Sequence, residues 1–245
     1  MYSRNRFYIN REEQRQLRDF RILLAGAGLG SVIAECALRM GFENITIIDG
    51  DVVERSNLNR QNYTCRDTGK AKAPALQERL TSINPEATIK SHCQYLTTGN
   101  MSELINDCDV VINAIDFTSE APFLLDRICI EKGITALHPY NLGWAACVFT
   151  VNRESQNLSY ISDDYHGFEL KFADYIIRQL RQQGYDIEWF SSMIEQYGKE
   201  ALSVPPPQLS AASWIVAGIC ADILFCLATG KKVKLFPDFY FGTVH

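Results

Sequence analysis

The sequence predicts an α/β fold with a doubly wound, mostly parallel sheet and a C-terminal helical and antiparallel extension. A buried strand, Ile22–Leu24, leads into a turn of small residues and then into a helix over Ser31–Met40. A second strand, Ile45–Ile48, follows, so these elements form a βαβ unit. The continuous apolar run Asp109–Ile115 is typical of a parallel strand that helices cover on both faces.

The first 152 residues alternate between helices and strands. Residues 1–20 form an N-terminal arm and a charged helix over Arg11–Phe20, and residues 21–152 form the core. Gly41 ends the first core helix because glycine tolerates a positive φ. Asn84-Pro85 ends the next helix because the residue before a proline resists helical geometry. The other predicted core elements are the helices Ala71–Ile83, Met101–Ile105 and Glu120–Lys132 and the strands Ala87–Tyr95, Ile134–Leu137 and Trp144–Asn152.

Residues 153–245 are predicted to add helices and one strand, without a second domain boundary, so residues 1–245 read as a single domain. A nearly all-apolar helix over Gln208–Leu227 should be buried, and we expect it at a subunit interface. We recognise no chemistry in this last third. Its other predicted elements are the helices Phe168–Gln183 and Asp186–Tyr197, the rigid connector Val204–Pro207 and the strand Val233–Phe241.

The composition is that of a globular cytoplasmic protein, with 245 residues, 47% hydrophobic and 22% charged. The net charge of −5 does not favour binding to a polyanion. We expect no signal peptide and no apolar run long enough to span a bilayer, hence no membrane partner. The eight cysteines include no Cys-x-x-Cys pair and are interpreted as reduced, mostly structural thiols, with Cys65 and Cys147 as the candidates for reactivity.

The turn after the first strand, together with the acids after the second strand, indicates a nucleotide site. Glycines there let phosphates approach a helix N-terminus, and an acid about twenty residues further on binds a ribose hydroxyl in such folds. Arg60 offers a bidentate fork and Lys72 a compact charge for phosphate oxygens, which suits a triphosphate rather than hydride transfer. The candidate binding residues are Gly26, Gly28, Gly30, Asp49, Asp51, Asn57, Arg60, Gln61 and Lys72.

Residues 49–61, Asp-x-Asp-x-Val-x-x-Ser-Asn-Leu-Asn-Arg-Gln, followed by Gly-Lys-x-Lys at 69–72, resemble the ThiF/MoeB/HesA family. These proteins are bacterial relatives of ubiquitin-activating enzymes. The resemblance covers residues 2–152 well and the last helix and tail more loosely. The family's turn is usually Gly-x-Gly-Gly-x-Gly, and one register puts Ala25 and Ala27 at two of those glycines. The other register makes Gly26 and Gly28 the turn glycines, and the sequence does not choose between them.

The resemblance implies a Rossmann-like fold and a homodimeric, ATP-dependent adenylyltransferase. Its substrate would be a carboxylate, by resemblance the C-terminal glycine of a ubiquitin-like or sulfur-carrier protein, activated as an acyl-adenylate with release of pyrophosphate. Asp116, an acid at the end of a central strand, would hold Mg²⁺ on the triphosphate; its alternative role is a helix N-cap. Arg4 would reach the neighbouring subunit's nucleotide, although an arginine so near a terminus is usually solvated. Arg4, Arg60, Lys72 and Asp116 are therefore the catalytic candidates.

Two absences refine this expectation. Without Cys-x-x-Cys pairs the chain should bind no zinc, and without a cysteine between Val148 and Ile219 it cannot form the crossover thioester of some relatives. Two other functions compete: activation of a modified-nucleoside carboxylate in tRNA on the same site, or an NAD-dependent oxidoreductase or nucleotide-sensing module. His138 is interpreted as a structural residue at a strand end.

Overall fold

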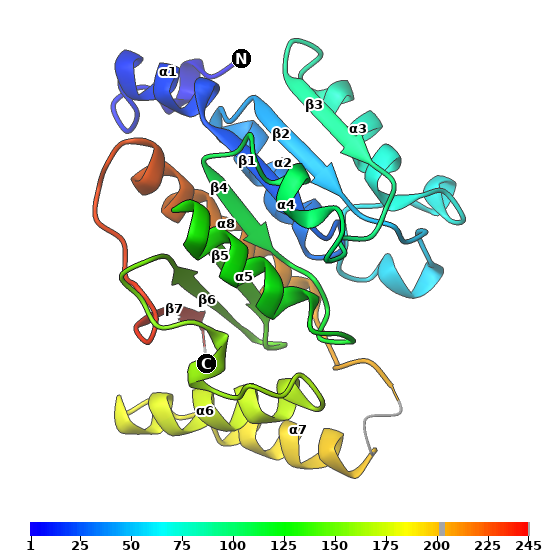
Figure 1. The fold of residues 1–245 in the computed structure, drawn as a ribbon, viewed down its shortest axis with the longest axis vertical. Coiled ribbons are helices and arrows are strands. Elements are labelled where there is room, and N and C mark those ends of the chain that lie inside the picture. Colours follow the sequence, from blue (N-terminus) through cyan, green and yellow to red (C-terminus); the bar gives the residue numbers. More distant parts are fainter. Residues whose placement is uncertain (201–203, 245) are drawn as a thin grey trace.

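A computed structural model describes residues 1–200 and 204–244. Its centre is a seven-stranded sheet in the order β3-β2-β1-β4-β5-β6-β7 (Figure 1). Strands β1 to β5 are parallel, and β6 and β7 are antiparallel, which confirms the predicted sheet. The bounds are β1 Arg21–Ala25, β2 Asn44–Ile48, β3 Thr88–His92, β4 Val110–Asn113, β5 Thr135–Asn141, β6 Ala145–Val151 and β7 Phe239–Thr243.

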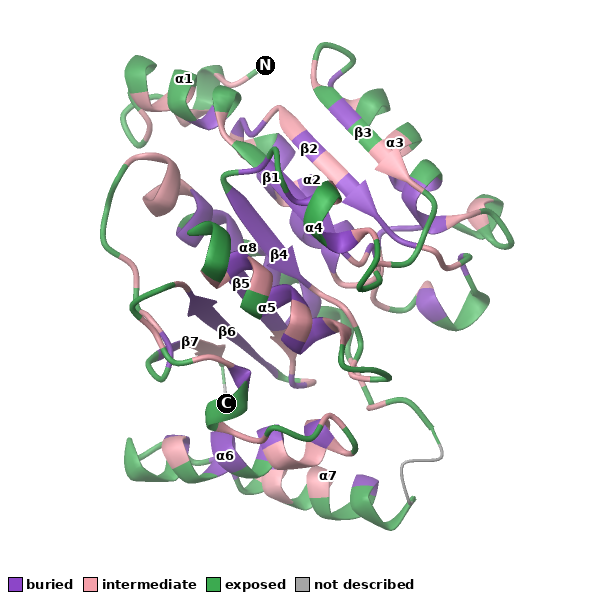
Figure 2. Ribbon diagram, in the orientation of Figure 1, coloured by how far each residue is buried: buried purple, intermediate pink, exposed green. Residues whose placement is uncertain are grey.

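Two apolar clusters, one on each face, hold the sheet between layers of helices. Alternate side chains of a strand point to opposite faces, so Ile22 and Leu24 join one cluster and Leu23 joins the other. The first cluster contains α2 (Gly30–Met40), α3 (Lys72–Ile83) and α8 (Ser210–Ala228). The second contains α4 (Met101–Leu104), α5 (Ala121–Lys132) and α6 (Phe168–Gln182). Figure 2 shows the resulting buried strands between partly exposed helices.

Helix α8 lies within the chain's own core, against α2, β5 and β6. Its length of 19 residues and a mean hydropathy of 2.0 would suit a membrane span, contrary to the expectation that no apolar run is long enough. However, 44% of that segment is buried inside the fold, and a core helix meets the same criteria of length and hydropathy. Trp214 remains half exposed, so a subunit interface along α8 stays a prediction.

The alternating pattern predicted the wrong position for the C-terminal strand. It begins at Phe239 instead of Val233, because the preceding residues form a turn in which the Asp238 N–H donates to the Leu235 carbonyl. Pro237 in this turn has no N–H to contribute to a ladder. Strand β5, in turn, extends beyond the predicted Leu137 to Asn141, since its hairpin with β6 supports it past the end of β4.

The remaining helices are α1 (Arg11–Asp19), at the amino ends of the strands, and α7 (Glu188–Lys199), which packs on α6. Figure 1 shows α6 and α7 as a pair beyond the sheet. Phe172 of α6 packs on Tyr140 and Phe149 of the β5–β6 hairpin, with ring centroids 4.0 and 5.5 Å away. These ring contacts fix the helical pair near the end of β5.

Candidate functional site

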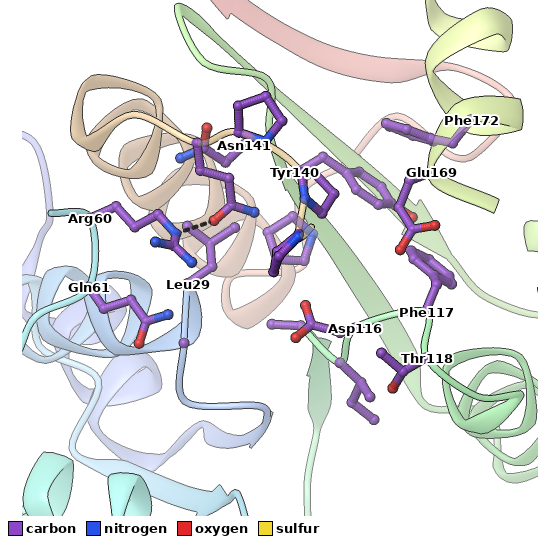
Figure 3. Close-up of a pocket in the computed structure, with 18 of the residues that line it drawn as sticks. Leu29, Arg60, Gln61, Asp116, Phe117, Thr118, Tyr140, Asn141, Glu169 and Phe172 are labelled. Carbon is purple, nitrogen blue, oxygen red and sulfur yellow. Dashed lines mark hydrogen bonds between the residues drawn. The ribbon is translucent and has the colours of Figure 1, made fainter. Parts of the chain in front are cut away.

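A cavity of about 1150 Å³ lies at the carboxyl ends of the parallel strands. Segments that follow three neighbouring strands line it: Gly28 after β1, Asp49 and Asp51 after β2, and Asp116 after β4. This edge, where the strand order turns from β1 to β4, is where doubly wound sheets bind ligands. The cavity continues beneath α6, α7 and residues 204–208, and Figure 3 shows part of its lining.

The turn after β1 depends on glycine at Gly26. Its φ is +96°, and a Cβ there would lie 2.4 Å from the Ala114 carbonyl oxygen. A Cβ at Gly28 would lie 3.1 Å from Gln61 Nε2, and one at Gly30 would lie 2.6 Å from Leu24 Cδ1. Of the two registers left open by the sequence, the geometry therefore favours Gly26 and Gly28 as the turn glycines. Helix α2 begins at Gly30, so its N-terminus faces the cavity.

Asp49, just after β2, stabilises this turn through hydrogen bonds. Its two carboxylate oxygens accept the N–H groups of Ala27 and Asp51, at 2.6 and 2.7 Å. Burial raises the pKa of Asp49, and the two backbone N–H groups oppose this rise. Asp49 also lines the cavity, and each carboxylate oxygen retains a lone pair for a further donor such as a ribose hydroxyl.

Asp51 and Lys72 form an ion pair at the same wall, with Asp51 Oδ2 3.0 Å from Lys72 Nζ. Tyr95, which the sequence analysis missed, donates its hydroxyl to the other carboxylate oxygen of Asp51 at 2.8 Å. Burial favours a higher pKa for Asp51, but the hydrogen bonds from Lys72 and Tyr95 outweigh it and lower the pKa. The side chain of Lys72 is 10% exposed and lines the cavity at the start of α3.

Arg60 is positioned by three hydrogen bonds, one of them to Gln208. Its guanidinium donates to the Ser56 carbonyl at 3.0 Å, to Asn59 Oδ1 at 2.8 Å and to Gln208 Oε1, the last contact being drawn in Figure 3. Asn59 itself donates to the Gln208 carbonyl at 3.2 Å. Burial lowers the pKa of Arg60 and the charge of Asp116 raises it, while an arginine stays cationic in proteins. Gln208, just before α8, thus anchors the arginine at the cavity wall.

The neutral candidates Asn57 and Gln61 also line the cavity. Asn57 is buried, and its Oδ1 accepts the Glu54 N–H at 3.0 Å, which fixes the loop that carries Arg60. Gln61 lies over Gly28, and within the described residues its buried Oε1 has no hydrogen-bond partner. Such a group is available to a ligand.

Asp116 points into the cavity between these groups (Figure 3). Burial raises its pKa, whereas the charges of Lys72 and Arg60 oppose the rise. It does not cap a helix, because α5 begins at Ala121 and the Ser119 hydroxyl accepts the Ala121 N–H at 3.3 Å. No group of three or more His, Cys, Asp or Glu side chains in the described part of the chain could hold a metal. One carboxylate fits Mg²⁺ nevertheless, because protein sites use one or two carboxylates plus substrate phosphates.

Arg4 is the catalytic candidate that lies away from the cavity of its own chain. It is exposed beside the far end of α2, where Tyr2 donates to the Leu38 carbonyl at 3.2 Å and Asn5 to the Met40 carbonyl at 2.9 Å. A role for Arg4 at the nucleotide therefore requires a second subunit.

Neither candidate cysteine lines the cavity. Cys65 is exposed on the loop after Gln61, and Cys147 lies in β6, where burial raises the pKa of its thiol well above the ordinary value. A buried thiol of this kind is unreactive. His138 is buried as well, with Nε2 2.7 Å from Asp126 Oδ1, although the two groups are not aligned as a hydrogen bond. It lies outside the cavity lining, as expected for a structural residue.

The last third, to which the sequence analysis assigned no chemistry, lines much of the cavity. The sequence predicted α6 and α7 as helices but not what their apolar side chains cover. Two sequence features could have indicated that residues 204–208 line the cavity. They are the proline run and the polar Gln208 at the start of an otherwise apolar helix pattern. The lining residues that sequence reasoning missed include Tyr95, Asn113, Tyr140, Glu169, Phe172 and Gln208.

Comparison with known proteins identifies a matching family and similar sequences. The model of the ThiF family matches residues 2–241. The sulfur carrier protein ThiS adenylyltransferase of Bacillus subtilis (strain 168) is 35% identical over 156 residues, which are 61% of this chain and 46% of that protein. The chain thus spans about half the length of this curated relative.

Two solved structures resemble the fold. PaaA aligns with a TM-score of 0.69 and 20% identity over 95% of this chain and 72% of PaaA. The Escherichia coli tRNA N6-threonylcarbamoyladenosine dehydratase TcdA, solved in complex with ATP, aligns with a TM-score of 0.53 and 26% identity over 58% of this chain and 65% of TcdA. PaaA supports the fold alone, whereas TcdA shows an ATP complex on a fold that this chain shares in part.

Proposed function

Because the chain belongs to the ThiF family, we propose that it is an ATP-dependent adenylyltransferase that activates a carboxylate as an acyl-adenylate. The observation that carries this proposal is the convergence of Arg60, Lys72 and Asp116 on one cavity at the N-terminus of α2. Two cations suit a triphosphate and the charge that develops at phosphorus. A dinucleotide site has no need for a metal-binding acid there, so we do not favour an NAD-dependent oxidoreductase.

The proposed binding mode follows from the positions of the lining residues. The phosphates would lie over Gly28 and the N-terminus of α2, with Arg60 and Lys72 as cations. Asn57 and Gln61 would add neutral donors, and Asp49 and Asp51 would accept from the ribose hydroxyls. Asp116 would hold Mg²⁺, which neutralises phosphate charge when bound.

In the reaction, a substrate carboxylate oxygen would attack the α-phosphorus. A new bond forms between this oxygen and the phosphorus, and the bond from phosphorus to the α,β-bridging oxygen breaks, so that pyrophosphate leaves. Arg60 and Lys72 would stabilise the charge on the phosphate oxygens, since fixed cations at a cavity wall need no reorganisation. The substrate already carries its negative charge, so this half-reaction needs no general base.

We propose the C-terminal carboxylate of a ubiquitin-like or sulfur-carrier protein as the substrate, in line with the printed function of the Bacillus relative. The alternative substrate, a modified-nucleoside carboxylate in tRNA, is supported by the partial likeness to the tRNA dehydratase. The net charge of −5 weighs against this alternative. We further propose a cytoplasmic homodimer in which Arg4 of each subunit serves the other's site, and no bound zinc.

The direct test is exchange of labelled pyrophosphate into ATP in the presence of a ThiS-type sulfur carrier protein. We expect exchange that requires Mg²⁺ and the carrier's C-terminal carboxylate, so a carrier truncated before its last glycine should be inactive. Arg60→Ala should abolish exchange, whereas Arg55→Ala should retain it, because Arg55 is exposed on the same loop outside the cavity. Exchange by Arg60→Ala at the wild-type rate would remove Arg60 from the mechanism. A lack of exchange with this carrier, combined with exchange stimulated by tRNA, would favour the alternative substrate.

A further inference from the structure

The nucleobase of the proposed ATP needs a binding surface of its own in the cavity. Along this edge of the sheet the parallel strands end in the order β3-β2-β1-β4. The phosphates would lie over the turn after β1, and the ribose would lie at Asp49 and Asp51 after β2. A nucleotide that extends in this direction places its base at the segment after β3, because the base and the phosphates leave the ribose on different sides.

The segment after β3 contributes the aromatic side chain of Tyr95 to the cavity lining. The His92 carbonyl, at the end of β3, accepts the Asp49 N–H at 3.1 Å, so this segment starts directly beside the ribose acids. Tyr95 follows three residues later and is 63% exposed. An exposed ring beside a ribose site offers a flat apolar face on which a base can stack.

Three contacts hold the ring of Tyr95 in place although it is exposed. Its hydroxyl donates to Asp51 Oδ1 at 2.8 Å, and this hydrogen bond raises the pKa of Tyr95. Its backbone carbonyl accepts a hydrogen bond from Asn100 Nδ2 at 2.9 Å. The ring itself lies against Gly50. Because these contacts fix the ring before a ligand arrives, stacking requires little further ordering of the side chain.

The close approach of this ring accounts for the glycine between the two ribose acids. The φ of Gly50 is not in the left-handed region, so its backbone conformation does not itself require glycine. A Cβ there would lie 2.8 Å from three ring atoms of Tyr95. Any larger residue at this position would therefore displace the ring from its place beside Asp49 and Asp51.

We propose that Tyr95 stacks on the base of the bound nucleotide while its hydroxyl holds Asp51 in position for the ribose. This inference rests on the proposed ATP binding and adds recognition of the base to it. Stacking uses the π-face of a base and does not read its hydrogen-bonding edge. Tyr95 therefore contributes affinity for a nucleotide and does not select between ATP and GTP.

The test combines two measurements on the full chain. Calorimetric titration gives the affinity for Mg·ATP, and the magnesium complex of 2-aminopurine riboside triphosphate reports stacking, because contact with an aromatic ring quenches its fluorescence. We expect Tyr95→Leu to bind Mg·ATP about tenfold more weakly than the wild type and to quench the bound probe less. Tyr95→Phe keeps the ring and should retain the quenching and most of the affinity.

Gly50→Ala tests the same contact from the other side, because its Cβ should displace the ring. If Gly50 acts through Tyr95, adding Gly50→Ala to Tyr95→Leu should lower the affinity for Mg·ATP little further, so the two effects are not additive. Tyr160→Leu is the matched control. Tyr160 is 55% exposed and lies outside the cavity lining, so both measurements should stay at their wild-type values.

Wild-type affinity for Mg·ATP in Tyr95→Leu, or wild-type quenching of the probe bound to it, would overturn the stacking role of Tyr95 and leave the adenylation proposal in place. Failure of the wild type to bind Mg·ATP would instead remove the proposed function and this inference together. The wild-type probe decides the question even where a variant does not fold, because a bound probe without quenching would exclude stacking.

Discussion

Lys72 Nζ lies 3.0 Å from the Asp51 carboxylate, so the cation proposed for the phosphates touches the acid proposed for the ribose. The Gly-Lys-x-Lys segment places Lys72 at the first residue of α3, and the end of β2 leads to Asp51. Neither charge is therefore unpaired before a nucleotide arrives. The contact joins two segments that sequence reasoning had connected only through their proposed roles.

Substitution of the two lysines of this segment should have different effects on the affinity for Mg·ATP. Lys72→Met should weaken Mg·ATP binding by about tenfold or more, because a hydrogen bond to a charged group contributes about 1.5–3 kcal/mol. Lys70→Met should change the affinity little, since Lys70 is 49% exposed and pairs with Asp67 at 3.2 Å. Calorimetric titration of both variants with Mg·ATP measures the difference. Equal losses in the two variants would contradict a specific role for Lys72.

Asp116 should make the protein less stable at neutral pH than a neutral side chain would. Its pKa in the folded state is raised from 3.8, so the fold favours the protonated carboxyl. The stability that this preference contributes is fully present below pH 3.8 and is lost as the pH rises through the raised pKa. Asp116→Asn should therefore unfold at higher denaturant concentration than the wild type at pH 7. The difference should shrink as the pH falls toward 3.8, because the wild-type carboxyl then becomes neutral too.

Urea unfolding of wild type and Asp116→Asn at pH 7 and pH 4 provides the comparison. Burial also raises the pKa values of Asp49 and Glu169, which are present in both proteins. Because the charge of Asp116 adds to the rise at Glu169, the loss of this charge lowers the pKa of Glu169 and adds to the expected stabilisation of Asp116→Asn at pH 7. A variant that is less stable than the wild type at pH 7 would show that Asp116 has a structural partner instead.

The turn at Gly26 should tolerate no side chain. Gly26→Ala adds a Cβ 2.4 Å from the Ala114 carbonyl oxygen at a φ of +96°, so we expect a loss of about 3 kcal/mol or more from strain and overlap together. Gly184→Ala is the matched control, because its φ is +83° but no atom lies within 4 Å of the added Cβ. There the loss should be about 1–2 kcal/mol, from strain alone. Free energies of unfolding from urea titrations give both values, and equal losses would argue against a crowded turn.

His138 should matter for stability and not for nucleotide binding. His138→Ala removes a buried side chain 2.7 Å from the buried Asp126 carboxyl, which then keeps, among the described residues, only the hydrogen bond from Asn113 Nδ2 at 3.3 Å, so we expect a loss of about 1–3 kcal/mol in the free energy of unfolding. His166→Ala removes an exposed histidine that lies 2.8 Å from Asp164 and should cost less than about 1 kcal/mol. If His138→Ala were as stable as the wild type but unable to bind Mg·ATP, the structural interpretation would be wrong.

Local signals were sufficient for the parts of the site that directly follow the parallel strands. The glycine turn, the acids after β2 and Asp116 after β4 meet at one sheet edge because parallel strands end on the same side. The contact of Gln208 with Arg60 could not be predicted, since it joins residues 148 positions apart through tertiary packing. Likewise, the sequence predicted α6 and α7 as helices but did not reveal the cavity that they line.

The role of Arg4 could not be settled from the sequence of a single chain. Arg4 lies outside its own cavity, so its proposed role depends on how two chains associate. The misplaced C-terminal strand has a local cause instead: an alternating pattern does not distinguish a strand from a turn that precedes it. The Phe236 N–H donates to the Thr150 carbonyl at 2.9 Å, and this contact fixes the turn beside β6.

The most direct test of the account is calorimetric titration of the purified chain with Mg·ATP and, separately, with NAD. We predict that Mg·ATP binds, that NAD does not compete with it, and that Asp116→Ala weakens Mg·ATP binding by about tenfold or more through loss of a charged metal ligand. Preference for NAD, or Mg·ATP binding that is unchanged in Asp116→Ala, would contradict an adenylating site at this cavity.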